Sequence, residues 1–124
     1  MPKSYAKVDV PKELSERILQ AVETARNTGK IRIGVNETTK ATEKGTAQLI
    51  VIAGDVEPEE IVMHLPVLCE EKKIPYVHVP SKLELGRSSG IDVGASAIAI
   101  LDAGEGKNLI KDITSSLEQI KKAS

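Results

Sequence analysis

The sequence predicts a single-domain α/β protein in which helices cover both faces of a small β-sheet. Segments whose apolar residues recur at helical spacing alternate with short apolar segments along almost the whole chain, and this order favours a layered sandwich. No linker, internal repeat or low-complexity stretch divides the 124 residues, a number that suits one domain. We therefore expect residues 1–124 to form one α-β-α sandwich. The pattern leaves the strand order open, and mixed pairing is one option.

The first expected helix and strand lie before residue 36. Apolar side chains recur at helical spacing over residues 11–27, Pro11 suits a first helical turn, and Gly29 is placed to end the helix. Residues 30–35 then alternate between mainly basic and apolar side chains, which predicts a short strand with one polar face.

Residues 36–45 predict a short helix of unusual polarity. Asn36 is placed to accept hydrogen bonds from the backbone of the first turn, and Gly45 is placed to end the helix. Only Ala41 is plainly apolar, so the helix has little to bury against a sheet. A polar helix between two strands indicates a role at the surface.

The rest of the chain predicts three strands and three helices. Gln48–Ala53 is apolar almost throughout, as expected of a central strand that is buried on both faces. A helix is expected to begin at Asp55–Glu60, where carboxylates favour the positive end of its dipole, and to continue over 61–72 with an interruption near Pro66. The remaining expected elements are a strand at 75–80, a helix at 82–87 capped by Ser81, a loop at 88–94, a strand at 96–101, a turn at 104–107, and an amphipathic helix at 108–122 with Leu109, Ile110, Ile113, Leu117 and Ile120 inward.

Composition restricts the ways in which this chain can bind a nucleic acid. Aromatic residues make up 2% of the chain and are all Tyr, which argues against the stacking platform of a single-strand binder. The net charge is −1 at pH 7, so the molecule as a whole is not a polycation. Binding to RNA would therefore depend on a local basic patch and on specific contacts.

The chain has the features expected of a cytoplasmic protein without a cofactor. Its one cysteine, Cys69, excludes an internal disulfide and suits a reducing compartment. No apolar run approaches the roughly 20 residues that span a bilayer, and the N-terminus lacks the apolar stretch of a secretory signal. We expect no bound metal and no cofactor.

The segment Gly34–Gly45 is the first candidate binding site. It leaves a strand and opens a helix, and helix N-termini attract phosphate through free backbone N–H groups. Asn36 and Lys40 share one helix face, and Lys44 lies one turn further along. A sheared G·A pair leaves N–H donors free on guanine, which Glu37 could accept from while Lys40 donates to the adjacent carbonyl or to phosphate. The alternative is an ordinary solvated helix with mixed charges.

The glycine-rich loop Leu85–Ala95 is the second candidate. It contains Ile91 and Val93, and apolar residues in a glycine-rich loop often mark a contact surface. Alternatively, these two residues begin the last strand and face the core. The stretch Gly86–Gly90 is not a Walker loop, because the required Gly-Lys-Ser/Thr end is missing.

Other arrangements have simpler structural explanations. Cys69 with His64 or His78 would suggest a thiol nucleophile, but no acid or oxyanion signature accompanies them, so a buried structural cysteine is favoured. The carboxylates within Asp55–Glu60 would suggest a divalent metal, but they lack the ligand spacing of a calcium loop. Stabilisation of a helix N-terminus explains these carboxylates more simply.

Two alternatives to RNA binding remain open at this point. The first is a small α/β enzyme acting on a nucleotide or phosphate ester, with Asn36, Lys40 and Asp55 in a cleft; it lacks a paired acid and base at a recognisable spacing. The second is a module that binds only protein, through Ile91 and Val93.

A family resemblance is carried by the same two segments. Over nearly the whole chain, GVNETTKATEKG and IVIAGDVEPEEIVMHLPVLCEEKKIPYVHVPSKLELGRSSGIDVGASAIAI resemble the archaeal member of the kink-turn RNA-binding family of ribosomal proteins. The specific motifs are an Asn-Glu-x-x-Lys helix and a Leu-Gly-x-x-x-Gly loop. The resemblance implies a mixed four-stranded sheet between helices, and a protein that holds RNA and is not an enzyme.

The resemblance also implies a role for each matched residue of the first segment. Gly34 would let the backbone approach the RNA. The positions that match contacts to tandem sheared G·A pairs are Asn36, Glu37 and Lys40. The positions that lie beside the kinked backbone are Thr39 and Lys44, and many relatives carry Arg at the latter, which would grip phosphate with two hydrogen bonds.

Further positions match the surroundings of an extruded loop nucleotide. Glu57, in a Glu-Pro motif, matches a contact to that nucleotide, and Lys82 matches a contact to the backbone or the loop. Ile91, Asp92 and Val93 match the loop that covers the nucleotide, where Asp92 is shorter than the Glu that is often found.

The implied partners are kink-turn RNAs and the proteins that assemble on them. Such RNAs occur in the large ribosomal subunit, in box C/D and H/ACA guide ribonucleoproteins for 2′-O-methylation and pseudouridylation, and in RNase P. A protein that binds only the kinked form shifts the RNA population toward it. The kinked RNA then becomes a platform for other ribonucleoprotein core proteins.

Overall fold

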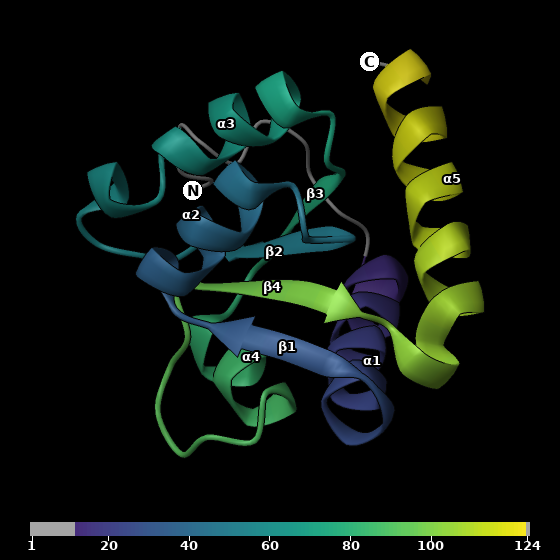
Figure 1. The fold of residues 1–124 in the computed structure, drawn as a ribbon, viewed down its shortest axis with the longest axis horizontal. Helices are drawn as coiled ribbons and strands as arrows, with labels where there is room; N and C mark the ends of the chain where they lie inside the picture. Colours follow the sequence, from purple (N-terminus) through teal and green to yellow (C-terminus); the bar gives the residue numbers. More distant parts are fainter. Residues whose placement is uncertain (1–11, 124) are drawn as a thin grey trace.

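The computed structural model describes residues 12–123, and it contains five α-helices and a four-stranded sheet within that range (Figure 1). The helices are α1 (Lys12–Thr28), α2 (Val35–Lys44), α3 (His64–Lys72), α4 (Lys82–Ser88) and α5 (Lys107–Ala123). The strands are β1 (Lys30–Ile33), β2 (Leu49–Ala53), β3 (Tyr76–Val79) and β4 (Ala97–Asp102). Two single 3₁₀ turns are η1 (Glu59–Ile61) and η2 (Gly104–Gly106). The expected role of Pro11, and the side chains of Leu117 and Ile120, lie outside the described residues.

The sheet is mixed, and its strands lie in the order β1-β4-β2-β3. Strand β2 pairs in parallel with β3 and antiparallel with β4, which in turn pairs antiparallel with β1. All five residues of β2 are buried, which confirms the expected central strand. In β1 the basic residues Lys30 and Arg32 are exposed, while Ile31 and Ile33 are partly buried, which confirms its polar face.

Helices cover both faces of the sheet, as expected. Figure 1 shows α2 and α3 on one face and α1 with α4 on the other, while α5 packs beside α1 at one end of the sheet. The core is aliphatic: the largest fully buried side chains include Ile18, Ile50 and Ile98. On α5, Ile113 is buried, and Leu109 and Ile110 pack partly against the core.

The inner face of α2 explains how so polar a helix lies on the sheet. Its buried residues are Thr38, Ala41 and Thr42, and the helix contacts β4 and β1. The two threonines supply methyl groups to the interior, and the hydroxyl of Thr42 donates to the carbonyl oxygen of Thr38 at 2.8 Å. The helix ends at Gly45, which takes a left-handed conformation, as expected.

The expected helix at Asp55–Glu60 is wrong. The chain turns after β2, forms η1, and begins α3 only at His64, so the interruption precedes Pro66, which lies in the first turn of α3. The cause is a contact with another element: the Asp55 carboxylate accepts a hydrogen bond from the backbone N–H of Lys82 at 2.8 Å. The carboxylate therefore satisfies the start of α4 and not the start of its own helix.

The helices within residues 12–123 are too short or too polar to cross a lipid bilayer.

The predicted cap of α4 is confirmed, because the Ser81 hydroxyl accepts from the backbone N–H of Glu84 at 3.2 Å.

Thr38 offers a test of how α2 is buried. Its hydroxyl oxygen has no hydrogen-bond partner among the described residues, and the residue is fully buried. Thr38→Val keeps the shape and removes the desolvated hydroxyl, so we expect the free energy of unfolding in urea to rise by about 1 kcal/mol. Thr42→Val is the matched control, which should not stabilise because it removes a hydrogen bond. A fall in stability for Thr38→Val would contradict this account.

His78 on β3 should make stability depend on pH. Burial lowers the pKa of His78 from 6.5 to about 4. Below pH 6.5 the unfolded chain binds a proton on His78 that the folded protein does not bind. The stability that depends on neutral His78 is therefore present above pH 6.5 and is lost as the pH falls towards 4. We expect about 2 kcal/mol of loss between pH 7 and pH 5 from this residue alone. Urea unfolding at both pH values should show a smaller loss in His78→Leu; equal losses in both proteins would contradict the assignment.

Candidate nucleic-acid interface

The directions of the strands bring both candidate segments to one end of the sheet. The carboxyl ends of β1, β2 and β3 and the amino end of β4 meet there, because β4 runs antiparallel to its two neighbours. The backbone N–H of Gly34, after β1, donates to the carbonyl oxygen of Ala97, at the start of β4, at 2.9 Å. In Figure 1 the start of α2, the η1 segment and the loop between α4 and β4 all lie at this end.

Gly34, and not Asn36, is the residue that precedes the first turn of α2. Its backbone has φ 101° and ψ 157°, a conformation that glycine adopts most readily, so the chain turns from β1 into the helix before Asn36 is reached. The expected cap by Asn36 is therefore wrong: Asn36 is already helical and exposed, and no side-chain cap bond is formed at this helix start. A Cβ atom on Gly34 would meet open space, so the backbone there is accessible.

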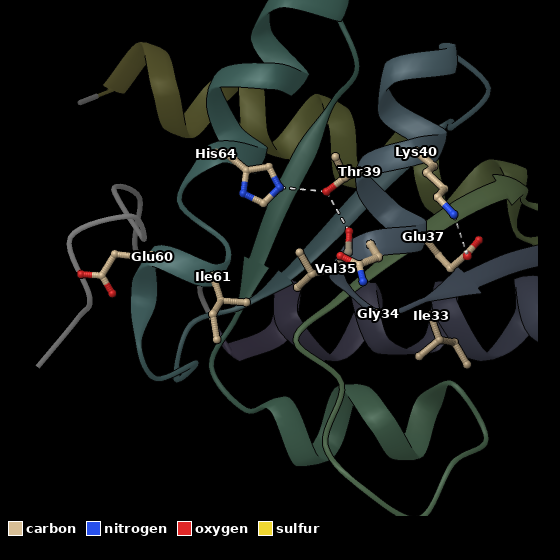
Figure 2. A pocket seen from close by; sticks show the side chains of 10 residues that line it. Ile33, Gly34, Val35, Glu37, Thr39, Lys40, Glu60, Ile61 and His64 are labelled. Atoms are coloured by element: carbon tan, nitrogen blue, oxygen red, sulfur yellow. Dashed lines mark hydrogen bonds and ion pairs between the residues drawn. The ribbon is translucent and has the colours of Figure 1, made fainter.

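A cleft of about 990 Å³ opens beside the start of α2 (Figure 2). Five of the residues predicted from the sequence line it together: Gly34, Asn36, Glu37, Thr39 and Lys40. The opposite side is formed by Glu60, Ile61 and His64, from η1 and the start of α3. Sequence reasoning missed these three, and the only signal was that Ile61 is a large apolar residue, which proves to be 43% exposed.

Glu37 and Lys40 present an acceptor and a donor side by side. Glu37 Oε1 lies 3.8 Å from Lys40 Nζ, one turn apart on α2, and both side chains are about half exposed or more. An exposed pair of this kind contributes little to stability. Both groups can therefore leave this ion pair and bind a ligand at a small cost in free energy.

Thr39 and His64 join the two sides of the cleft. Thr39 Oγ1 lies 2.8 Å from His64 Nε2, and the same hydroxyl donates to the carbonyl oxygen of Val35 at 2.8 Å. Figure 2 shows the two side chains pointing toward each other across the cleft, with the Glu37–Lys40 pair on the other side of Thr39.

The second candidate loop is anchored to α4 and exposes its tip. The N–H of Ile91 donates to the carbonyl oxygen of Gly86 at 3.0 Å, and the N–H of Ala95 donates to that of Lys82 at 2.9 Å. Gly86 has no room for a Cβ atom, which would overlap the carbonyl oxygen of Val93. Val93 is 65% exposed, whereas Ile91 packs partly against the core. Neither residue belongs to β4, which begins at Ala97, so the alternative that both begin the last strand is wrong.

The other predicted residues lie outside the cleft. Glu57 and Asp92 are exposed near the same end of the sheet, and Lys82 begins α4, where its backbone binds Asp55 and its side chain lies against Gly94. Lys44 is the last residue of α2, about 10–15 Å from the start of a ten-residue helix. The structure therefore places Lys44 apart from the cleft.

The alternative chemistries find little support among the described residues. Asp55 does not line the cleft with Asn36 and Lys40, which separates the three residues of the enzyme hypothesis. Burial raises the pKa of the Cys69 thiol to about 11, against a smaller lowering by a hydrogen bond with Thr42, so the thiol stays protonated at neutral pH. Within the described part of the chain, no three His, Cys, Asp or Glu side chains are grouped to hold a metal ion.

Comparison with known proteins agrees with the fold. Residues 16–110 match the model of the ribosomal protein L7Ae/L30e/S12e/Gadd45 family. The solved structure of a Giardia lamblia 15.5 kD RNA-binding protein is 34% identical, with a TM-score of 0.89, and the match covers 95% of this chain and 98% of that one. The chain therefore belongs to the ribosomal protein L7Ae/L30e/S12e/Gadd45 family.

Proposed function

We propose that this chain binds kink-turn RNA, reading tandem sheared G·A pairs with α2 and covering an extruded nucleotide with the loop that contains Val93. The observation that carries the proposal is the exposed Glu37–Lys40 pair beside the open start of α2. Family membership and the RNA-binding relative support a non-enzymatic RNA-binding protein.

The Glu37–Lys40 pair complements the edge of a guanine. In a sheared G·A pair, the pairing edge of guanine offers N–H donors next to a carbonyl acceptor. A carboxylate accepts from those donors, and an ammonium group 3.8 Å from it can reach the carbonyl or a nearby phosphate. Regular A-form RNA hides its base edges in a deep groove, so this contact selects a distorted stem.

The backbone at the start of α2 suits the phosphates of the same stem. The first N–H groups of a helix point outward along its dipole, and here no side chain caps them within the described structure. Gly34 leaves open space in front of them, so a phosphate can approach closely. Asn36 and Thr39 lie next to this point in the cleft, and Lys44 adds a positive charge further along α2.

The loop after α4 supplies an apolar cover for a nucleotide that leaves the stack. Val93 is exposed at the tip, and the carbonyl of Val93 lies against Gly86, which holds the tip close to α4. In the proposal, Val93 and Ile91 cover the extruded base, while Glu57, Asp92 and Lys82 contact its polar edge and backbone. The bond between Asp55 and the N–H of Lys82 joins the segment of Glu57 to the start of α4.

We extend the proposal to the RNAs that would carry such kinks: rRNA of the large subunit, box C/D and H/ACA guide RNAs, and RNase P RNA, all in the cytoplasm. Kinked and extended forms of these RNAs interconvert. A protein that binds only the kinked form makes that form dominant. The bent RNA then offers other core proteins of the particle a fixed surface.

Loss of either charge in the pair should weaken binding. We expect Glu37→Ala and Lys40→Ala each to cost about 1–3 kcal/mol of binding free energy, the usual scale for a base-edge contact. The measurement is a calorimetric titration against a kink-turn stem. Glu43→Ala is the matched control, because Glu43 is exposed on the same helix but does not line the cleft.

The same titration tests the choice of RNA. A stem in which both sheared pairs are replaced by Watson–Crick pairs should bind much more weakly than the kink-turn stem. Equal affinity for the two stems would refute the proposed function, and unchanged binding in both the Glu37 and Lys40 variants would refute the assignment of the site.

Truncation at Val93 should separate binding from stability. Val93 is 65% exposed, so Val93→Ala should change the free energy of unfolding by less than about 0.5 kcal/mol. Binding to a stem with an extruded nucleotide should weaken by about 1 kcal/mol, since the apolar cover is lost. A variant that binds this stem as tightly as the wild type would show that the tip does not contact the nucleotide.

A further inference from the structure

We propose that His64 is a positioning residue of the RNA site: it donates to Thr39 and so holds the first turn of α3 against α2 across the cleft. The inference rests on the proposed function, because it concerns the same surface. The sequence offered no reason to single out His64 for this role, since its partner lies 25 residues earlier in the chain.

The hydrogen bonds of Thr39 fix the tautomer of His64. Thr39 Oγ1 lies 2.8 Å from the carbonyl oxygen of Val35 and 2.8 Å from His64 Nε2. A carbonyl oxygen can only accept, so the single hydroxyl proton of Thr39 points to Val35. The hydroxyl oxygen then accepts from the imidazole, whose Nε2 must carry a proton.

This bond connects the side of the cleft that packs on the sheet to a side that comes from a segment leaving the sheet. The buried face of α2 lies on the sheet through Thr38, Ala41 and Thr42. The other side comes from a segment that leaves the sheet after β2 and whose lining residue Ile61 is half exposed. The Thr39–His64 bond joins the two sides of the cleft, and the Glu37–Lys40 pair lies beyond Thr39 on the same helix (Figure 2).

Loss of the bond should affect RNA binding more than folding. His64 is exposed, and an exposed hydrogen bond between neutral groups makes a modest net contribution, so the fold should persist without it. The two sides of the cleft would then have to be ordered when RNA binds, which weakens affinity. We expect a loss of about three- to tenfold, the factor that corresponds to one such bond.

A double-mutant cycle tests the inference against a kink-turn stem. His64→Ala and Thr39→Val should each weaken binding by about three- to tenfold, and the double variant should bind no more weakly than either single variant. His64→Gln should restore affinity to within about twofold, because a Gln side-chain amide can donate from a similar position. Tyr76→Phe is the control: it removes another exposed side-chain hydrogen bond, to Glu70 at 3.0 Å, on residues that do not line the cleft, and should leave affinity unchanged.

Two results would overturn the inference. Wild-type affinity in His64→Ala would show that the bond does not position the site, and losses that add in the double variant would show that His64 contacts RNA directly. A measurement without RNA is independent of both: ¹⁵N NMR at pH 9, where histidine side chains are neutral, should show the proton of His64 on Nε2. A proton on Nδ1 would refute the hydrogen bond itself. Failure of the proposed function would look different, because the wild-type protein would then fail to prefer the kinked stem.

Discussion

The arrangement of the whole interface depends on the directions of the strands in the sheet. Because β4 runs antiparallel to both of its neighbours, its amino end meets the carboxyl ends of β1, β2 and β3. Segments that are more than 60 residues apart in the chain therefore meet at one end of the sheet, joined there by the bond from Gly34 to Ala97. A sheet of uniform direction would have divided these segments between its two ends. The cleft and the start of α4 lie at this end because β1, β2 and β3 share one direction, and the exposed loop tip joins them because β4 runs the other way.

Helix α2 separates a structural face from the proposed binding face within ten residues. Its inward side is built from threonine methyl groups and one alanine, which give close packing on β4 without the bulk of larger side chains. Its outward side carries the charged pair and opens at a glycine that no side chain caps within the described residues. The polarity that looked unfavourable for a helix on a sheet is thus divided by face: the inward face packs on the sheet, and the outward face is exposed for the proposed contact with RNA.

The sequence predicted best what depends on near neighbours along the chain. The buried strand β2, the Ser81 cap and the glycine end of α2 follow from periodicity and from short-range hydrogen bonding. The start of α2 was misplaced because the unusual φ of Gly34, and not a side-chain cap, begins the helix. The helix expected at Asp55 failed because that carboxylate binds a residue 27 positions away. Strand order and the His64 side of the cleft could not be predicted, since both depend on contacts between distant segments.

The Glu37–Lys40 pair has a further consequence for selectivity among the many RNAs of a cell. A bare lysine attracts every phosphate and releases counterions from any duplex, whatever its shape. Here a carboxylate lies 3.8 Å from the lysine, and in a molecule of net charge −1 it repels the backbone of an ordinary duplex. Only a partner that gives the carboxylate its own hydrogen-bond donors removes that repulsion. In the proposed complex, Glu37 thus contributes to selectivity in two ways: its carboxylate repels ordinary duplexes, and it binds the donors that a kinked stem exposes.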